Sequence, residues 1–275
     1  MIISDKDLAE VILDADNEDL GILIDMITDS GKGRMSLTSS VCTQLTNAKS
    51  TNIYDEVTRA LIAEELSRFG GNSLANFLRG GEGVSYKEIA MDVAKRVKAP
   101  FNSQHDCLTI EAAIISKVME KTLEKMTEEE RKEFFSSVGQ SYIPGSGPAA
   151  MAALLAILSK QGMFQLSSIL ANATATAFVG RGLFYSSAAV APAAYTAFIG
   201  PIGWAITALW TAYDLSSPAY RVTVPCVIQI AYMRRKKLEN PCIKCGTSLP
   251  NDAKFCTECG QAQNQHSTLK LTSDS

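Results

Sequence analysis

Four cysteines near the C-terminal end of the sequence have the spacing of a metal-binding motif. Cys242 and Cys245 form one Cys-x2-Cys pair, and Cys256 and Cys259 form a second pair after a ten-residue spacer. Two such pairs that face each other supply four thiolates, which is the closed tetrahedral shell that structural zinc prefers. The spacing therefore predicts a zinc ribbon over residues 238–262, with Zn2+ as a structural cofactor. Two disulfides or a redox-active dithiol are the alternatives that the spacing leaves open.

The residues around these cysteines agree with a ribbon. Gly246 and Gly260 each follow a cysteine pair, where the tight turn at a metal favours the positive φ that glycine adopts easily. Residues 249–252 (Leu-Pro-Asn-Asp) are typical of a turn between two short strands. A segment this short cannot build a hydrophobic core. Metal binding, worth about 10–16 kcal/mol in zinc-finger peptides, is expected to supply its folding free energy.

The part of the chain before the apolar region, residues 1–145, shows helical periodicity and no strand pattern. Apolar residues recur at three-to-four spacing, so this part predicts a run of amphipathic helices. The first three predicted segments cover residues 4–15, 17–29 and 53–69, and Ser4 is the opening residue of the first. In the third segment the pattern places Ile53, Val57, Leu61 and Phe69 on one apolar face.

Two later helices have sequence signals at their starts. Ser85 precedes Glu88 by three residues, and Thr127 precedes Glu130 by the same spacing. This is the capping-box pattern, in which each side chain bonds to the backbone of the other residue. The helical patterns together predict an all-α fold for the main part of the chain.

A long apolar region follows a proline- and glycine-rich stretch at residues 142–148. Between residues 147 and 220 only Lys160, Arg181 and Asp214 are charged, and residues 182–213 carry no charge. The region is rich in small residues, which suit either the buried centre of a soluble helical bundle or helices packed in a bilayer. Both interpretations stay open. In the second, residues 182–213 insert into the bilayer as a hairpin.

Composition shifts divide the chain into five parts. A short helical segment is followed by an amphipathic helical domain, an apolar helical region that packs on it or continues it, the ribbon and a disordered tail. The predicted boundaries are 1–35, 36–145, 146–237, 238–262 and 263–275.

The basic run Arg234, Arg235, Lys236 and Lys237 follows an apolar helical stretch over residues 224–233. Such a run can sit on anionic lipid at the cytoplasmic face of a membrane. It can equally be a solvated helix end that is favoured by the helix dipole. The run and residues 182–213 are therefore the candidate membrane contacts.

The net charge and the cysteines limit the cellular compartments and the classes of partner that we expect. The formal net charge is −3, and the N-terminal stretch from Met1 to Ser30 carries nine acids against one lysine, so nucleic acid is expected only through the ribbon. No secretory signal is recognisable at the N-terminal end. Cys42, Cys107 and Cys226 lie far apart in sequence, as free thiols of a reducing compartment would. We expect a cytoplasmic protein, with association with the inner membrane as the alternative.

No convincing catalytic constellation is present in the sequence. The chain has two histidines: His105 lies beside Asp106 in a polar turn, and His266 lies in a polar tail, where it is a weak rival metal ligand. The glycines at 80, 81 and 83 lack the lysine and serine that end a phosphate-binding loop. The chain is therefore expected not to be an enzyme, with no catalytic or cofactor-binding residues.

Three blocks of sequence resemble the YaaW family of uncharacterised bacterial proteins. They are residues 69–80 (Phe-Gly-Gly-Asn-Ser-Leu-Ala-Asn-Phe-Leu-Arg-Gly), 86–97 and 219–230, the last containing Ala-Tyr-Arg-Val-Thr, and the similarity covers most of residues 1–237 in the same order. That family is associated with a ubiquinol–cytochrome c chaperone-like domain. The resemblance implies a helical fold and transfers no mechanism, because the chaperone label is an analogy of fold. The zinc ribbon is an addition to the family pattern.

Two classes of function remain. In the first, the chain is a non-enzymatic interaction or chaperone-like protein that binds an unidentified protein partner. In the second, it is a membrane-acting effector in stress or defence whose hairpin at residues 182–213 inserts into the bilayer. The first class predicts a soluble protein, and the second predicts detergent-dependent behaviour.

Overall fold

The computed structural model describes residues 3–34, 37–70, 83–137, 141–145, 163–179, 202–203, 206, 219–242, 244, 249 and 253–263. The prediction of an all-α fold is confirmed, since nine helices and no strand longer than an isolated bridge residue lie in these ranges; Phe255 and Ala262 form one such bridge. The helices are α1 (Lys6–Ile12), α2 (Asn17–Thr28), α3 (Ser39–Thr51), α4 (Glu56–Gly70), α6 (Tyr86–Val97), α7 (Cys107–Lys125), α8 (Glu128–Ser137), α10 (Met163–Val179) and α13 (Tyr220–Glu239).

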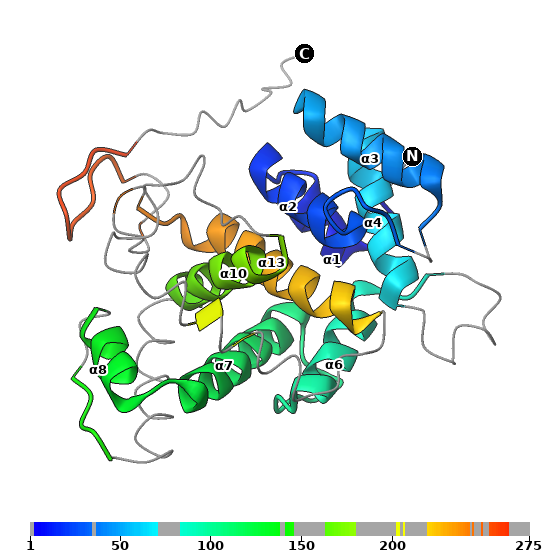
Figure 1. Ribbon diagram of the computed structural model, residues 1–275. Coiled ribbons are helices and arrows are strands. Elements are labelled where there is room, and N and C mark those ends of the chain that lie inside the picture. The colour runs from blue at the N-terminus through cyan, green and yellow to red at the C-terminus, as the bar shows by residue number, and fades with distance from the viewer. Residues whose placement is uncertain are drawn as a thin grey trace.

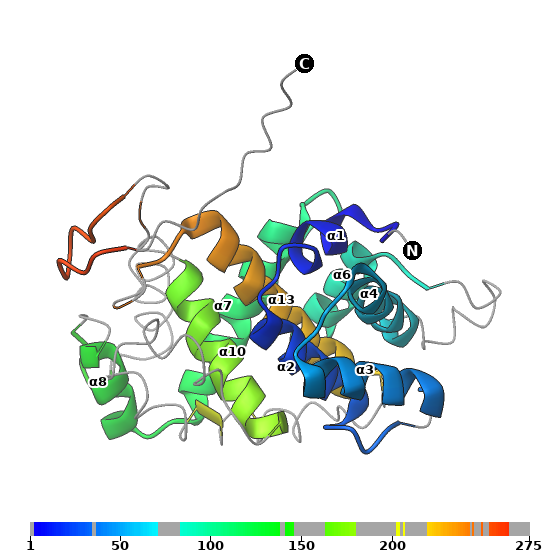
Figure 2. The same cartoon turned by 90° about the horizontal axis from the view of Figure 1, so that it is seen from above.

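Helix α13 is the axis of the helical assembly (Figures 1 and 2). It packs along α10 and also contacts α1, α2, α4, α6 and α7, while α3 is added on the outside of α2 and α4. Every residue of α13 from Val222 to Arg234 is buried. A helix that is apolar around most of its circumference is stable only when other helices cover all its faces, which accounts for this central position.

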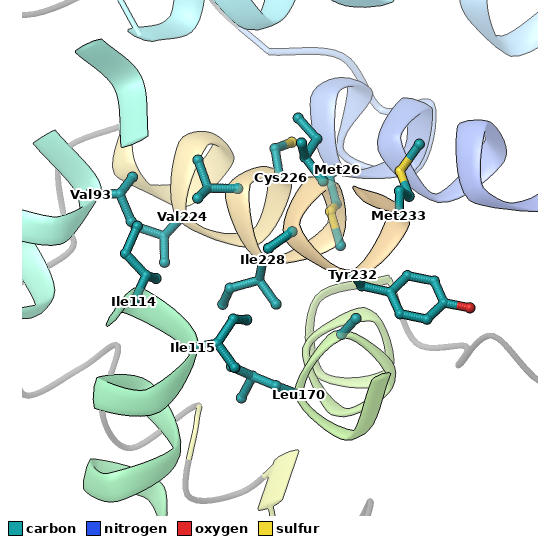
Figure 3. Close-up of a cluster of buried hydrophobic side chains, with 14 of the residues drawn as sticks. Met26, Val93, Ile114, Ile115, Leu170, Val224, Cys226, Ile228, Tyr232 and Met233 are labelled. Carbon is teal, nitrogen blue, oxygen red and sulfur yellow. The ribbon is translucent and has the colours of Figure 1, made fainter. Parts of the chain in front are cut away.

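The core forms where the other helices meet α13. Figure 3 shows Val224 and Ile228 of α13 directed toward side chains of the surrounding helices, and the Tyr232 ring centre lies 5.7 Å from that of Phe164 in α10. Those neighbours include Met26 of α2, Val93 of α6, Ile114 and Ile115 of α7, and Leu170 of α10, all of them buried. The core therefore joins residues near both ends of the sequence.

Side chains close to the helix starts fix where several helices begin. The Thr127 hydroxyl accepts a hydrogen bond from the Glu130 N–H at 3.2 Å. The Thr127 N–H donates to the Glu130 carboxylate at 2.8 Å. This capping box is therefore confirmed. The Ser85 hydroxyl accepts from the Glu88 N–H at 3.3 Å. The first helix differs from its prediction, because it is capped by Asp5, whose carboxylate accepts from the Leu8 N–H, and not by Ser4.

The predicted apolar face of α4 is wrong at its N-terminal end. Leu61 and Phe69 are buried as expected, but Ile53 and Val57 are 66% and 45% exposed. The reason is local, because the Asp55 carboxylate accepts a hydrogen bond from the Thr58 N–H at 2.8 Å. A carboxylate that bonds in this way caps a helix, and α4 accordingly begins at Glu56. Ile53 thus lies outside the helix whose stripe it was assigned to.

The apolar region at residues 182–213 is described only at Ile202, Gly203 and Ile206, and both isoleucines are buried. Among the helices that the structure describes, none is both long and apolar enough to cross a bilayer. The rest of the predicted hairpin lies outside the described residues, as does the predicted tail at 263–275 apart from Gln263. The five domain boundaries stay predictions.

Candidate functional site

Three of the four predicted zinc ligands lie together at the end of α13. The Sγ atoms of Cys242, Cys256 and Cys259 all lie within 4.8 Å of one another, and those of Cys242 and Cys259 are 3.6 Å apart. Cys242 and Cys256 are buried, and Cys259 is partly exposed. The fourth predicted ligand, Cys245, lies outside the described residues.

These sulfur positions suit a shared metal ion. Tetrahedral coordination with zinc–sulfur bonds of about 2.3 Å places neighbouring sulfurs about 3.8 Å apart. A disulfide would require a sulfur–sulfur distance of about 2.05 Å. None of these three cysteines is in a disulfide. The 3.6 Å separation of Cys242 and Cys259 is thus close to the spacing of two ligands on one ion, and these three cysteines could hold a metal ion.

Hydrogen-bond donors surround the Cys242 sulfur. It accepts from the Lys244 backbone N–H (3.4 Å) and from the Gln263 side-chain amide (3.3 Å). Donors directed at a sulfur favour its thiolate form and orient it as a ligand. Gly260 has φ +70°, as expected for the residue after the second cysteine pair, whereas Gly246 lies outside the described part of the chain.

The cysteine cluster is fastened to the last turn of α13. Asn240 ends this helix in the left-handed conformation, and its side-chain amide donates to the Leu249 carbonyl at 3.5 Å. The Leu249 N–H is directed at the carbonyl oxygens of Glu239 (3.4 Å) and Asn240 (3.2 Å). Leu249 packs with Cys242 and Cys256 in a small cluster separate from the main core. The segment that carries the cysteines therefore also supplies hydrogen bonds to the C-terminal end of α13.

Most side chains of the basic run that precedes this segment form ion pairs or hydrogen bonds with other parts of the fold. Arg234 is buried, and its Nε lies 3.2 and 3.0 Å from the two carboxylate oxygens of Glu111 in α7. Its Nη2 donates to the Asp7 carbonyl (3.0 Å), and the Tyr86 hydroxyl donates to Glu111 (2.7 Å). For Arg234, the interpretation as part of a solvated helix end is wrong.

The two lysines of the run bind the N-terminal helices. Lys236 contacts the carboxylates of Asp16 (2.5 Å) and Asp19 (3.0 Å), and Asp19 also accepts from the Gln229 side-chain amide (3.1 Å). Lys237 contacts the Asp14 carboxylate (2.5 Å). The excess of acids near the N-terminal end was the only sequence signal of these partners, and it did not identify them.

Burial governs the ionisation of these groups. It raises the pKa of Asp19 to about 6, against the opposing attraction of Lys236. It also raises the pKa of Glu111, which Arg234 opposes, and the pKa of the Tyr86 hydroxyl. Each of these groups lies in an ion pair or hydrogen bond between helices, so the shifts reflect packing.

The remaining candidate residues have structural surroundings. His105 is exposed, and its Nδ1 accepts from the Asn102 N–H (3.2 Å), which confirms the polar turn. His266 lies outside the described residues. Cys42, Cys107 and Cys226 are free, as predicted, and all three are buried.

Comparison with known proteins identifies the family. A UPF0174 protein of Helicobacter pylori strain J99 is 40% identical over 178 residues, which cover 64% of this chain and 70% of that protein. UPF0174 protein YaaW of Escherichia coli K12 is 31% identical over 246 residues, covering 85% of this chain and 95% of that protein. No family model and no solved structure matches the chain significantly. With this similarity over nearly the whole of YaaW, the chain belongs to the UPF0174 family.

Proposed function

We propose that this chain is a non-enzymatic interaction protein whose helical domain docks a protein partner and whose C-terminal cysteines form a structural zinc ribbon. The observation that carries the proposal is an exposed apolar patch where α1 ends and α4 begins, formed by Leu13, Ile53 and Val57. Their exposed fractions are 48%, 66% and 45%. We call it the α1–α4 patch.

Backbone contacts bring the two parts of the α1–α4 patch together. The Arg59 guanidinium donates to the carbonyls of Ile12 (2.6 Å) and Ala15 (3.1 Å), and its Nε donates to the Tyr54 carbonyl (3.1 Å). The Asn17 side chain donates to the Asn52 carbonyl (3.0 Å). Leu13 is therefore held beside the segment that carries Ile53 and Val57, and its exposure is fixed by the fold.

Acidic side chains border the α1–α4 patch. Asp14 and Asp16 keep 67% and 54% of their side-chain surface exposed while they pair with lysines of α13. Asp55 and Glu56 are exposed beside Val57, and hydrogen bonds from Thr58 lower the pKa of Asp55. An apolar centre with an acidic border complements a basic amphipathic helix, which can insert apolar residues and pair its cations at the rim. A helix of this type is the proposed partner.

The role of zinc in the ribbon is structural in this proposal. Four thiolates leave no coordination position for water or substrate, so such a site stabilises a fold. Cys245 would complete the set formed by Cys242, Cys256 and Cys259. The Lys244 and Gln263 donors at the Cys242 sulfur support this assignment, because such contacts accompany metal-bound thiolates.

The α1–α4 patch can be tested with a synthetic Leu/Lys amphipathic helical peptide as the probe, measured by fluorescence anisotropy. Ile53→Asp should weaken binding at least tenfold, because it places a charge in the apolar centre. Ile143→Asp is the matched control, since Ile143 is an equally exposed isoleucine (73%) that follows α8. Equal effects of the two substitutions, or no binding by the wild-type chain, would contradict the proposed docking surface.

The zinc ribbon can be tested by elemental analysis of anaerobically purified protein. We expect one zinc per chain, lost in Cys256→Ser because three thiolates leave the shell incomplete. Cys42→Ser is the control, as Cys42 lies in α3 and should leave the metal content unchanged. A chain without bound metal would refute the ribbon.

A further inference from the structure

One cysteine of the metal cluster is more accessible than the others. Cys259 is partly exposed, whereas Cys242 and Cys256 are 0% and 3% exposed. Among the three described cysteines of the cluster, Cys259 is therefore the most accessible to a dissolved oxidant. Oxidation of a thiolate depends on its exposure as well as on its charge.

The Cys242 sulfur lies 3.6 Å behind Cys259, close enough to attack it after a small movement. The Lys244 N–H and the Gln263 amide are both directed at this sulfur, and their hydrogen bonds hold it in place beside Cys259. Cys242 thus has the position of a resolving cysteine.

The other described thiols lie in the helical core and lack this accessibility. Cys107 and Cys226 are 4% and 0% exposed. Burial raises the pKa of Cys226 to about 12 and that of Cys107 well above its ordinary value, so both remain protonated at neutral pH. They are therefore internal controls for any reaction at the ribbon.

We propose that Cys259 and Cys242 form a peroxide-sensitive pair, in which oxidation of Cys259 is followed by a disulfide with Cys242 and by loss of the bound metal. The inference rests on the proposed zinc ribbon and adds its regulation. The Cys259 thiolate attacks one peroxide oxygen, which gives a sulfenic acid and releases hydroxide. The Cys242 thiolate then attacks the Cys259 sulfur, forms the S–S bond and expels a second hydroxide. Two protons convert both hydroxides to water.

The disulfide removes two thiolates from the shell, so the remaining ligands no longer retain the metal. The two cysteines lie 17 positions apart, and their bond would join the two cysteine pairs to each other. A bond within either pair would not do this. The identity of the bond therefore distinguishes this pair from ordinary oxidation of a Cys-x2-Cys dithiol.

The test uses the full chain, purified anaerobically, with its metal content measured first. Hydrogen peroxide is added in steps, released zinc is followed with a metallochromic dye, and remaining thiols are alkylated before peptide mapping by mass spectrometry. We expect the first bond to join Cys242 and Cys259 as metal appears. When half of Cys259 has reacted, less than one tenth of Cys107 and Cys226 should have done so.

Two variants separate the proposed bond from its alternatives. Cys256→Ser should still form the Cys242–Cys259 bond, whereas Cys242→Ser should leave Cys259 as a sulfenic acid that a dimedone probe traps. A first bond within Cys242–Cys245 or Cys256–Cys259, or oxidation of Cys107 at the same rate, would overturn the proposal. A chain purified without metal would instead refute the ribbon. Peptide mapping of the metal-free chain after peroxide treatment should still show the Cys242–Cys259 disulfide. Absence of that disulfide would refute the proposed peroxide-sensitive pair.

Discussion

Replacing Arg234 with alanine should destabilise the helical domain more than any surface substitution in the basic run. The side chain of Arg234 is 8% exposed and that of its partner Glu111 is 1% exposed. The substitution removes the bonds to Glu111 and to the Asp7 carbonyl, and it also removes the cation whose Cζ lies 5.8 Å from the centre of the Tyr86 ring. Glu111 would then be a buried carboxylate whose remaining bond comes from the Tyr86 hydroxyl.

The expected cost follows from that uncompensated charge. Breaking a buried ion pair by removing one partner typically costs about 3–5 kcal/mol. This is a large share of the roughly 5–15 kcal/mol that stabilises a typical protein. For a domain of this size it lowers the midpoint of thermal unfolding by roughly 6–20 °C.

The cost of Arg234→Ala should depend on pH with a definite sign. In wild type, burial already raises the pKa of Glu111 and Arg234 lowers it, so the substitution moves the folded-state pKa further upward. A carboxyl group with a raised folded pKa favours folding below its unfolded pKa, and that contribution is lost as pH rises through the folded value. The free energy of unfolding of Arg234→Ala should therefore move closer to that of wild type as pH falls from 7 to 4.5.

Urea unfolding followed by circular dichroism at several pH values measures this effect. Adding Glu111→Gln to Arg234→Ala should recover about 2 kcal/mol or more at pH 7, because a neutral amide replaces the buried charge. Lys237→Ala is the surface control and should cost about 0–1 kcal/mol, since its pair with Asp14 is half exposed or more on both sides. A loss below about 1 kcal/mol for Arg234→Ala, or a loss unchanged from pH 7 to 4.5, would refute the reasoning.

Two further substitutions test packing and ionisation elsewhere. Gly70→Ala should cost about 1–3 kcal/mol by chemical unfolding, because a Cβ there would lie 2.3 Å from the Ile89 Cγ1. Combining it with Ile89→Ala should cost less than the sum of the two single losses, and strict additivity would contradict the clash. Asp19→Asn should gain stability relative to wild type as pH rises from about 4 through 6, because the raised pKa of Asp19, about 6, means that wild type loses stability over that interval. Parallel pH profiles of the two proteins would count against a buried, titrating Asp19.

The helix starts show what could be predicted from the sequence. Thr127 and Glu130 bond to each other across three residues, so their spacing contains the whole interaction. The grouping of Cys242 with Cys256 and Cys259 was likewise foreseeable, because ligand spacing in a short segment limits where the sulfurs can lie. The assignment of Ile53 to the helix failed because periodicity alone did not show that Asp55 would cap the helix.

The sequence by itself determined the helical class, several helix boundaries and the grouping of three cysteines that could hold a metal ion, because these depend on contacts between residues close in the chain. Only the tertiary structure decided that α13 lies at the centre and that Arg234 is buried against Glu111, 123 positions away. It also paired Lys236 with Asp19, 217 positions away. Periodicity defines the apolar face of a helix and leaves open which helix covers it. Likewise, a run of charges does not identify the opposite charges that three-dimensional packing brings to it.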